Sequence, residues 1–201
     1  MTEYRYYPGA TAVGIIVKDG VVLAADKRVT YGFMLMSRAG KKVYKITDRI
    51  GIASAGLISD MQTLARSLEA EAKLYEYDTG APITVRGMAK LLSLILFNRR
   101  LFPYFVETIV GGVDLSGPHI FVLDPIGALI EDKYAALGTG AQLAISIIED
   151  EYDENASLED ARRLAVKSVK AAFSRDAISG DGIDLILIGK DFTKEEFIPV
   201  V

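Results

Sequence analysis

Four polar residues stand at the ends of apolar segments, and their side-chain types suit proton transfer. Asp26 directly follows the apolar run Val21–Ala25, and Lys42 precedes a second strand-like segment. A carboxylate at a strand end orients or ionises a neighbouring amine, and a partly buried lysine near other cations has a lowered pKa. Asp176 and Ser179 lie in a glycine-rich loop. If the fold brings these groups together, they can orient an amine and move a proton.

Each of these residues also has an ordinary structural explanation. Under the first alternative, Asp26 forms a surface ion pair with Lys27 or Arg28, the two cations that follow it. Lys42 is a solvated charge under the second alternative, and Asp176 with Ser179 forms a turn motif under the third. The residue types alone leave these alternatives open.

Hydrophobic periodicity predicts strands and helices that come in blocks along the chain. We expect strands over 11–17 and 21–25, joined by an Asp-Gly turn, and then over 43–46, 50–55, 105–113, 119–123, 128–130, 134–137 and 183–189. We expect helices over 60–77, 85–101, 141–152 and 157–173, with Thr84 and Ser157 at two of their starts. Such blocks favour an α+β fold over a doubly wound α/β sheet. The predicted fold is a single-domain, four-layer αββα sandwich, in which two packed antiparallel sheets are flanked by helix pairs.

Composition excludes several classes of protein. The 201 residues carry a net charge of −4, which argues against nucleic acid as the main partner. The absence of cysteine excludes disulfides, zinc–cysteine sites and a cysteine nucleophile, and His119 is the only imidazole for a catalytic triad. The chain has no secretory signal and no apolar run of about 20 residues, so we expect a cytoplasmic protein without a membrane segment.

Seven short segments match one protein family in both order and spacing. They are Gly9–Gly14, Val21–Arg28, Gly40–Lys42, Ala55–Asp60, Gly111–Asp114, Gly138–Gly140 and Arg175–Gly180. The set resembles the β-subunits of the 20S proteasome core, and it is most similar to archaeal β-subunits. The resemblance extends from Gly9 to Gly189 and is far more specific than any single motif. It implies the N-terminal nucleophile hydrolase type of αββα sandwich.

In that family, the hydroxyl of an N-terminal threonine attacks the peptide carbonyl. The free α-amino group, with a pKa of about 8, acts as the base. The resemblance implies a lysine that lowers the hydroxyl pKa and an aspartate that positions this lysine, and these roles fall on Lys42 and Asp26. A second aspartate and a serine that hold the amine and a water fall on Asp176 and Ser179. The oxyanion N–H falls on Gly56, and Thr139 replaces a further residue that is usually a serine.

The match fails at the nucleophile. Counting back from three segments by the family's spacings places the threonine at residue 10, which is Ala10. Thr11 is an alternative nucleophile, but side chains alternate faces along a strand, so its hydroxyl should point the other way. Self-cleavage should fail without a hydroxyl at residue 10. We therefore expect residues 1–9 to stay attached as an unprocessed propeptide, followed by a β-type domain over residues 10–201.

Ala10 is compatible with two histories, a naturally silent β-subunit paralogue or an active subunit with an engineered Thr→Ala change. The family activity is threonine-type endopeptidase cleavage of unfolded polypeptides. We expect this chain to be inactive because Ala10 stands at the position of the nucleophile. A non-catalytic structural β-subunit that positions or activates a catalytic neighbour is the alternative function. A bacterial two-ring protease of the same fold, or a binding module without peptidase history, matches the segment order less well.

The resemblance also implies partners and a substrate pocket. The partners are proteasome α-subunits and other β-subunits in stacked seven-membered rings, unfolded polypeptide substrates and, only indirectly, a regulatory ATPase. No cofactor and no metal are implied. Val29, Ser54 and Ile58 would line a medium-sized apolar pocket for the residue before the cleaved bond.

Overall fold

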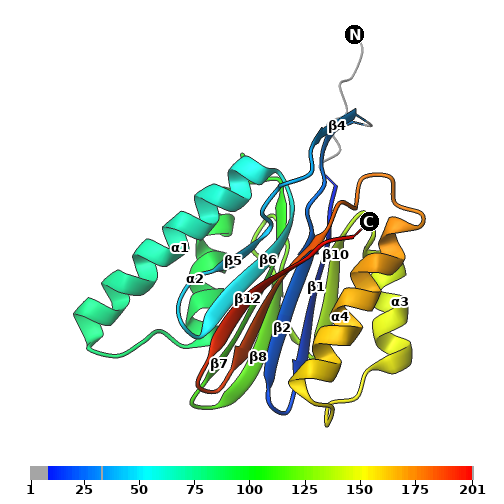
Figure 1. The fold of residues 1–201 in the computed structure, drawn as a ribbon. Helices are drawn as coiled ribbons and strands as arrows, with labels where there is room; N and C mark the ends of the chain where they lie inside the picture. Colours follow the sequence, from blue (N-terminus) through cyan, green and yellow to red (C-terminus); the bar gives the residue numbers. More distant parts are fainter. Residues whose placement is uncertain (1–8, 33, 201) are drawn as a thin grey trace.

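The computed structural model describes residues 9–32 and 34–200, and these form four layers (Figure 1). Two five-stranded antiparallel sheets pack face to face, and a pair of helices covers the outer face of each sheet. The predicted α+β fold, an αββα sandwich, is therefore confirmed. Residues 1–8 of the expected propeptide lie outside the described residues, whereas Gly9 lies within them.

The first sheet carries the predicted N-terminal hairpin at its centre. In spatial order it contains β10 (Tyr134–Gly138), β1 (Thr11–Val17), β2 (Gly20–Asp26), β11 (Ile183–Gly189) and β12 (Thr193–Ile198). Helices α3 (Ala141–Glu151) and α4 (Leu158–Phe173) pack on its outer face. Sequence analysis missed β12, because this edge strand is partly exposed and carries three consecutive charges at 194–196, which hide any alternating pattern.

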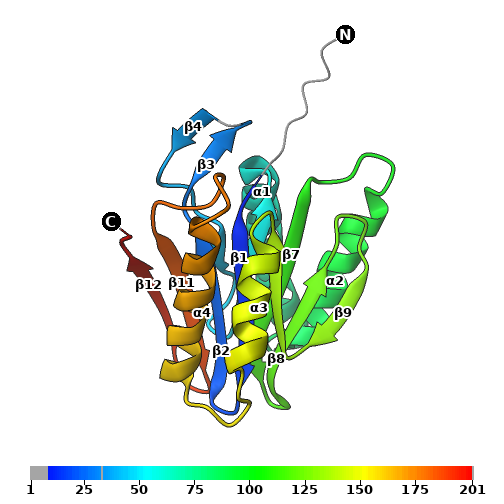
Figure 2. The same ribbon diagram turned by 90° about the vertical axis from the view of Figure 1, so that its right-hand side faces the viewer.

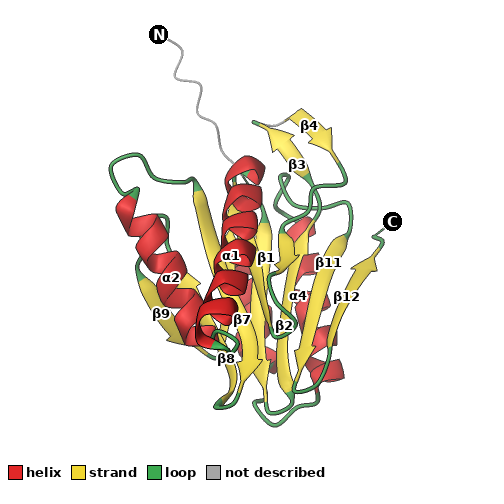
Figure 3. Ribbon diagram, turned by 90° about the vertical axis from the view of Figure 1, so that its left-hand side faces the viewer, coloured by secondary structure: helices red, strands yellow, loops and turns green. Residues whose placement is uncertain are grey.

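The second sheet lies under the other helix pair. In spatial order it contains β5 (Val43–Lys45), β6 (Ile50–Gly56), β7 (Val106–Asp114), β8 (Gly117–Leu123) and β9 (Leu129–Asp132). Helices α1 (Ile58–Thr79) and α2 (Val85–Asn98) cover its outer face (Figure 3). The predicted N-cap of α2 is confirmed, since the Thr84 hydroxyl accepts a hydrogen bond from the Gly87 N–H. No helix among the described residues is long and apolar enough to cross a membrane.

A short hairpin projects beyond both sheets at the end where the chain enters β1 (Figure 2). It consists of β3 (Val29–Tyr31) and β4 (Met34–Ser37), which pair antiparallel. Neither strand was predicted. Every residue of β4 is exposed, so the strand has no buried face and its sequence shows no alternation of apolar and polar residues.

Glycines let the two sheets approach each other closely. Most of the apolar side chains between the sheets are large or β-branched, among them Leu23, Ile109 and Ile120. On β7, a Cβ at Gly111 would lie 2.9 Å from Val21 Cγ1 and 3.0 Å from Leu23 Cδ2. A side chain at this position would therefore have to push the sheets apart or displace its neighbours.

Gly111→Val should lower the free energy of unfolding by about 1–3 kcal/mol, because the added atoms overpack the layer between the sheets. Urea unfolding followed by circular dichroism measures the change. Ala70→Val, at an exposed position on α1, is the control and should cost less than about 1 kcal/mol. Equal losses in the two variants would show that the spacing between the sheets does not depend on this glycine.

Candidate active site

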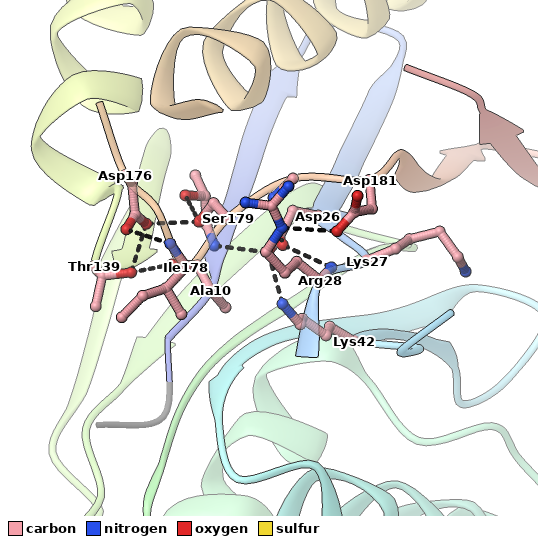
Figure 4. A network of polar contacts seen from close by, with 12 residues as sticks. Ala10, Asp26, Lys27, Arg28, Lys42, Thr139, Asp176, Ile178, Ser179 and Asp181 are labelled. Atoms are coloured by element: carbon pink, nitrogen blue, oxygen red, sulfur yellow. Dashed lines mark hydrogen bonds and ion pairs between the residues drawn. The ribbon is translucent and has the colours of Figure 1, made fainter. Parts of the chain in front are cut away.

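Antiparallel pairing brings the predicted site residues to one end of the sandwich. Thr11 at the start of β1 pairs with Gly138 at the end of β10. Asp26 at the end of β2 pairs with Ile183 at the start of β11. Strand ends that are far apart in sequence therefore meet, and the loops that leave them carry the polar groups (Figure 4).

Lys42 and Asp26 form a buried ion pair that joins the two sheets. Lys42 lies immediately before β5 of the second sheet, and its Nζ is 2.7 Å from Asp26 Oδ1 at the end of β2. Both side chains are almost completely excluded from solvent. Burial lowers the pKa of the Lys42 ammonium, although the neighbouring Asp26 carboxylate opposes this change. The alternative that Lys42 is a solvated charge is therefore wrong.

The Asp26 carboxylate is held by backbone groups as well as by Lys42. Its Oδ1 accepts a hydrogen bond from the Thr11 N–H at 2.9 Å. Its Oδ2 accepts hydrogen bonds from the N–H groups of Arg28 at 2.9 Å and Gly180 at 3.0 Å. One carboxylate thus fixes the start of β1, the segment after β2 and the loop before β11, and it keeps the Lys42 ammonium in place.

The two cations after Asp26 pair elsewhere, so the surface-pair alternative for Asp26 is also wrong. Lys27 Nζ lies 2.6 Å from Asp184 Oδ2. Arg28 Nε donates to Asp181 Oδ2 at 2.7 Å, so its guanidinium pairs with Asp181 rather than with Asp26. Asp181 in turn raises the pKa of Arg28, and Arg28 lowers the pKa of Asp181. Sequence analysis missed this pair, because no local spacing links positions 28 and 181.

Arg28 also shapes the loop that carries two predicted site residues. Its Nη1 donates to the Ala177 carbonyl at 2.8 Å. A Cβ at Gly180 would lie 2.6 Å from Arg28 Nη2, so the guanidinium packs directly against this glycine. Asp181 is the only non-glycine residue with positive φ in the described chain, at 68°. The Arg28 contacts hold the loop in this conformation.

Asp176 is the centre of a second hydrogen-bonded group. Its Oδ2 accepts bonds from the Ser179 hydroxyl at 2.7 Å and the Thr139 hydroxyl at 2.6 Å. Its Oδ1 accepts a bond from the Ile178 N–H at 3.1 Å. The threonine at position 139 therefore makes the hydrogen bond that a serine would make, despite its added methyl. Within residues 9–32 and 34–200, no three His, Cys, Asp or Glu side chains are grouped so as to hold a metal ion.

Thr11 contacts this second group rather than solvent. Its Oγ1 lies 2.7 Å from the Ser179 Oγ, and the residue has no exposed surface. Gly140 packs directly on the Thr11 hydroxyl, and any side chain at 140 would collide with it. This enclosed position disfavours the alternative that Thr11 attacks a substrate, and it gives the Thr11 hydroxyl a role in fixing the loop.

Ala10 lies between the Lys42–Asp26 pair and the Asp176 group (Figure 4). Its carbonyl oxygen is 3.3 Å from the Thr139 hydroxyl. The residue is fully buried and belongs to the apolar cluster between the sheets. Ala10 therefore lies beside the polar groups predicted to serve a threonine hydroxyl, and its own side chain is a methyl group.

The predicted oxyanion residue and the three predicted pocket residues lie in different surroundings. Gly56 has a φ of 135°, a conformation that other residues rarely adopt, and a Cβ there would collide with the Phe105 carbonyl. Val29 and Ile58 are half-buried and both lie next to Gly40. Ser54 has no exposed surface, and its hydroxyl is 3.0 Å from that of Thr108 on β7. Of the three predicted pocket residues, only Val29 and Ile58 are brought together at accessible positions.

The αββα sandwich with a polar site at one end is the architecture of N-terminal nucleophile hydrolases. A model of the proteasome subunit family matches residues 6–188. The chain is 59% identical over 192 residues to proteasome subunit beta 2 of Pyrobaculum arsenaticum, which covers 96% of this chain and 95% of that protein. It is 60% identical over 193 residues to proteasome subunit beta 2 of Thermofilum pendens, covering 96% and 94%. Proteasome subunit beta 1 of Ignicoccus hospitalis is 55% identical over 181 residues, covering 90% and 91%. The chain therefore belongs to the proteasome subunit family and is similar to archaeal β-subunits.

Asp26→Asn should lower the free energy of unfolding by about 3–5 kcal/mol, because it leaves the buried Lys42 ammonium without a counter-charge. The double variant Asp26→Asn/Lys42→Met should recover part of this loss, since it removes the unpaired charge as well. Urea unfolding of the parent, both single variants and the double variant gives the coupling free energy. Losses that simply add would contradict a direct buried interaction.

The lowered pKa of Lys42 predicts a pH dependence with a definite sign. The unfolded chain binds the lysine proton up to the ordinary pKa of 10.5, whereas the folded chain releases it at a lower pH. Between these two pKa values the unfolded state binds more protons, so the stability contributed at Lys42 rises with pH. The parent should therefore gain stability relative to Lys42→Met as the pH approaches 10.5. A difference that stays flat or falls in urea titrations over this range would rule out a lowered pKa.

Proposed function

We propose that this chain is a β-subunit of the 20S proteasome core particle whose own cleavage site is silent. The single observation that carries the proposal is the position of Ala10. It lies where the Lys42–Asp26 pair and the Asp176 group converge, and it has no hydroxyl. Family membership supports the assignment to the proteasome, and the missing hydroxyl supports the loss of peptide cleavage.

The surrounding residues retain the roles that a threonine at position 10 would need. The Lys42 ammonium would lower the pKa of the hydroxyl, and Asp26 would hold Lys42 in place. Asp176 with Ser179 would bind the α-amine and a water, and Thr139 would take the place of the usual serine. The hydroxyl would attack the peptide carbonyl while the α-amine accepts its proton, and the Gly56 N–H would stabilise the resulting oxyanion.

The same substitution should prevent maturation. In a self-processing subunit, the hydroxyl of residue 10 attacks the peptide bond before it and thereby frees the α-amine that later serves as base. Ala10 offers no such nucleophile, so residues 1–9 remain as a propeptide on a domain of residues 10–201. Gly9 supports this account, because it packs so closely on Ile178 that no side chain fits there.

The proposed partners are α-subunits and other β-subunits in stacked seven-membered rings, with unfolded polypeptides as the substrates of the assembled particle. A regulatory ATPase would act only indirectly, by delivering these substrates. Exposed apolar side chains support large subunit contacts, in particular Tyr77, Leu101 and Phe102, each more than 80% exposed. The relatives carry numbered names, beta 1 and beta 2, which supports a ring built from more than one kind of β-subunit.

The second candidate function is that of a structural β-subunit that positions or activates a catalytic β neighbour. The observation that favours it is the completeness of the network around Ala10, which gives the chain a fixed conformation without any reaction. The two candidates differ in the history of Ala10. A native alanine codon favours the structural subunit, whereas an engineered change favours a subunit that is otherwise active.

Ala10→Thr should restore processing and peptidase activity when the chain is assembled with its partner subunits, because only the hydroxyl is missing. Intact-mass measurement should show loss of residues 1–9 in this variant and retention of these residues in the parent. Ala10→Thr/Lys42→Met is the matched control and should stay unprocessed.

Two outcomes would contradict the proposal. A parent chain that begins at residue 10 or 11 would show that cleavage does not need the missing hydroxyl. An assembled Ala10→Thr chain that remains intact would show a second defect. Ala10→Thr/Thr139→Ser then tests whether the extra methyl at position 139 is responsible.

A further inference from the structure

We propose that Glu107 on β7 is a positioning residue, whose carboxylate fixes the distance between the nucleophile position and the oxyanion N–H. The role at the reaction rests on the proposed function, whereas the contact itself is a property of this fold. Glu107 Oε2 accepts a hydrogen bond from the Gly138 N–H at 3.2 Å. Glu107 belongs to the second sheet and Gly138 to the first, so this bond crosses between the sheets.

The proposed reaction depends on the spacing between the two sheets. Residue 10 leads into β1 of the first sheet, whereas Gly56 ends β6 of the second. The distance from an attacking hydroxyl to the oxyanion N–H is therefore an inter-sheet distance. Lys42–Asp26 is one side-chain link between the sheets at this end, and Glu107–Gly138 is another.

Gly138 is the point where the Glu107 bond acts on the site. It has a φ of 88°, and a Cβ there would collide with the Ala10 carbonyl and lie 2.8 Å from the Ala55 Cβ. Gly138 thus lies between Ala10, which precedes β1 of the first sheet, and Ala55 of the second sheet. Ala55 pairs with Glu107 across the β6–β7 ladder. The carboxylate therefore holds Gly138 against the residue that precedes Gly56.

Among the residues that the structure describes, Glu107 makes no other side-chain hydrogen bond or ion pair that explains its presence between buried residues. The residues on either side of it, Val106 and Thr108, are buried, and Glu107 is half-buried. It has no ion-pair partner among the described residues, so its charge is not neutralised by a neighbouring cation. A half-buried carboxylate costs free energy unless its hydrogen bonds compensate. The bond to Gly138 is the compensation that the structure provides.

The role needs an acceptor oxygen and not a charge, and this makes it testable. In the Ala10→Thr background, Glu107→Gln keeps an acceptor of the same size, whereas Glu107→Met keeps the length and removes the acceptor. A misplacement near 1 Å costs up to about 100-fold in rate. Glu107→Met should therefore lower kcat at least ~10-fold, with KM changed less than ~3-fold, and Glu107→Gln should stay within ~3-fold of the Ala10→Thr parent.

Glu131→Met is the matched control, because Glu131 lies on β9 of the same sheet and pairs with Arg86 and His119, outside the site. It should leave kcat unchanged. If Glu107 served only the stability of the fold, its variants would lower the amount of folded enzyme, and kcat would not differ between Glu107→Gln and Glu107→Met. If Glu107→Gln loses as much kcat as Glu107→Met, or neither variant changes kcat, the proposed positioning role is overturned.

A second measurement does not depend on activity. In the parent chain with Ala10, hydrogen exchange of the Gly138 amide should become at least ~10-fold faster in Glu107→Met and remain near the parent rate in Glu107→Gln and Glu131→Met. If the Ala10→Thr chain proves inactive, this result still upholds the contact while the proposed function fails. Unchanged exchange in Glu107→Met overturns the inference whatever the activity.

Discussion

The buried ion pair between Lys42 and Asp26 is the interaction on which the rest of this site depends. It joins the two sheets at the end of the sandwich where the chain enters β1. An ammonium without a partner would be strongly unfavourable at this depth, so the carboxylate must stay in place beside it. The backbone N–H groups of three separate segments satisfy that carboxylate. The electrostatic requirement of one lysine thereby sets the positions of β1, the segment after β2 and the loop before β11.

The Asp26 pair and the Asp176 group are coupled through Thr11. The Thr11 N–H faces Asp26, whereas its hydroxyl faces Ser179 and, through it, Asp176. A single residue therefore connects both halves of the site across the first strand. Arg28 adds a second connection, because its N–H bonds to Asp26 and its guanidinium holds the loop around Asp181. Such mutual hydrogen bonding makes this group of residues rigid.

This coupling gives the intact network around Ala10 a structural explanation. The sequence alone leaves open whether the retained site residues reflect recent activity or a long-silent subunit. In the structure the same residues carry the local fold, since Asp26 and Asp176 each satisfy several backbone or hydroxyl donors. Their loss would cost stability whether or not a reaction takes place. A subunit without peptidase activity would therefore have a physical reason to keep them, whereas the Ala10 side chain takes part in no hydrogen bond of this network and only its carbonyl does.

Local sequence patterns determined the elements with clear periodicity, and the spacing of several motifs together determined the family, the site segments and the alanine at position 10. Only the tertiary structure decided what those residues touch. It placed Lys42 out of solvent, paired Arg28 with Asp181, enclosed the hydroxyl of Thr11 and brought Glu107 to Gly138. The exposed strand β4 and the charged edge strand β12 also escaped the sequence patterns, because strands without a buried face leave no apolar alternation. These contacts follow from strand pairing within the first sheet and from the packing of the two sheets, and no local pattern records either.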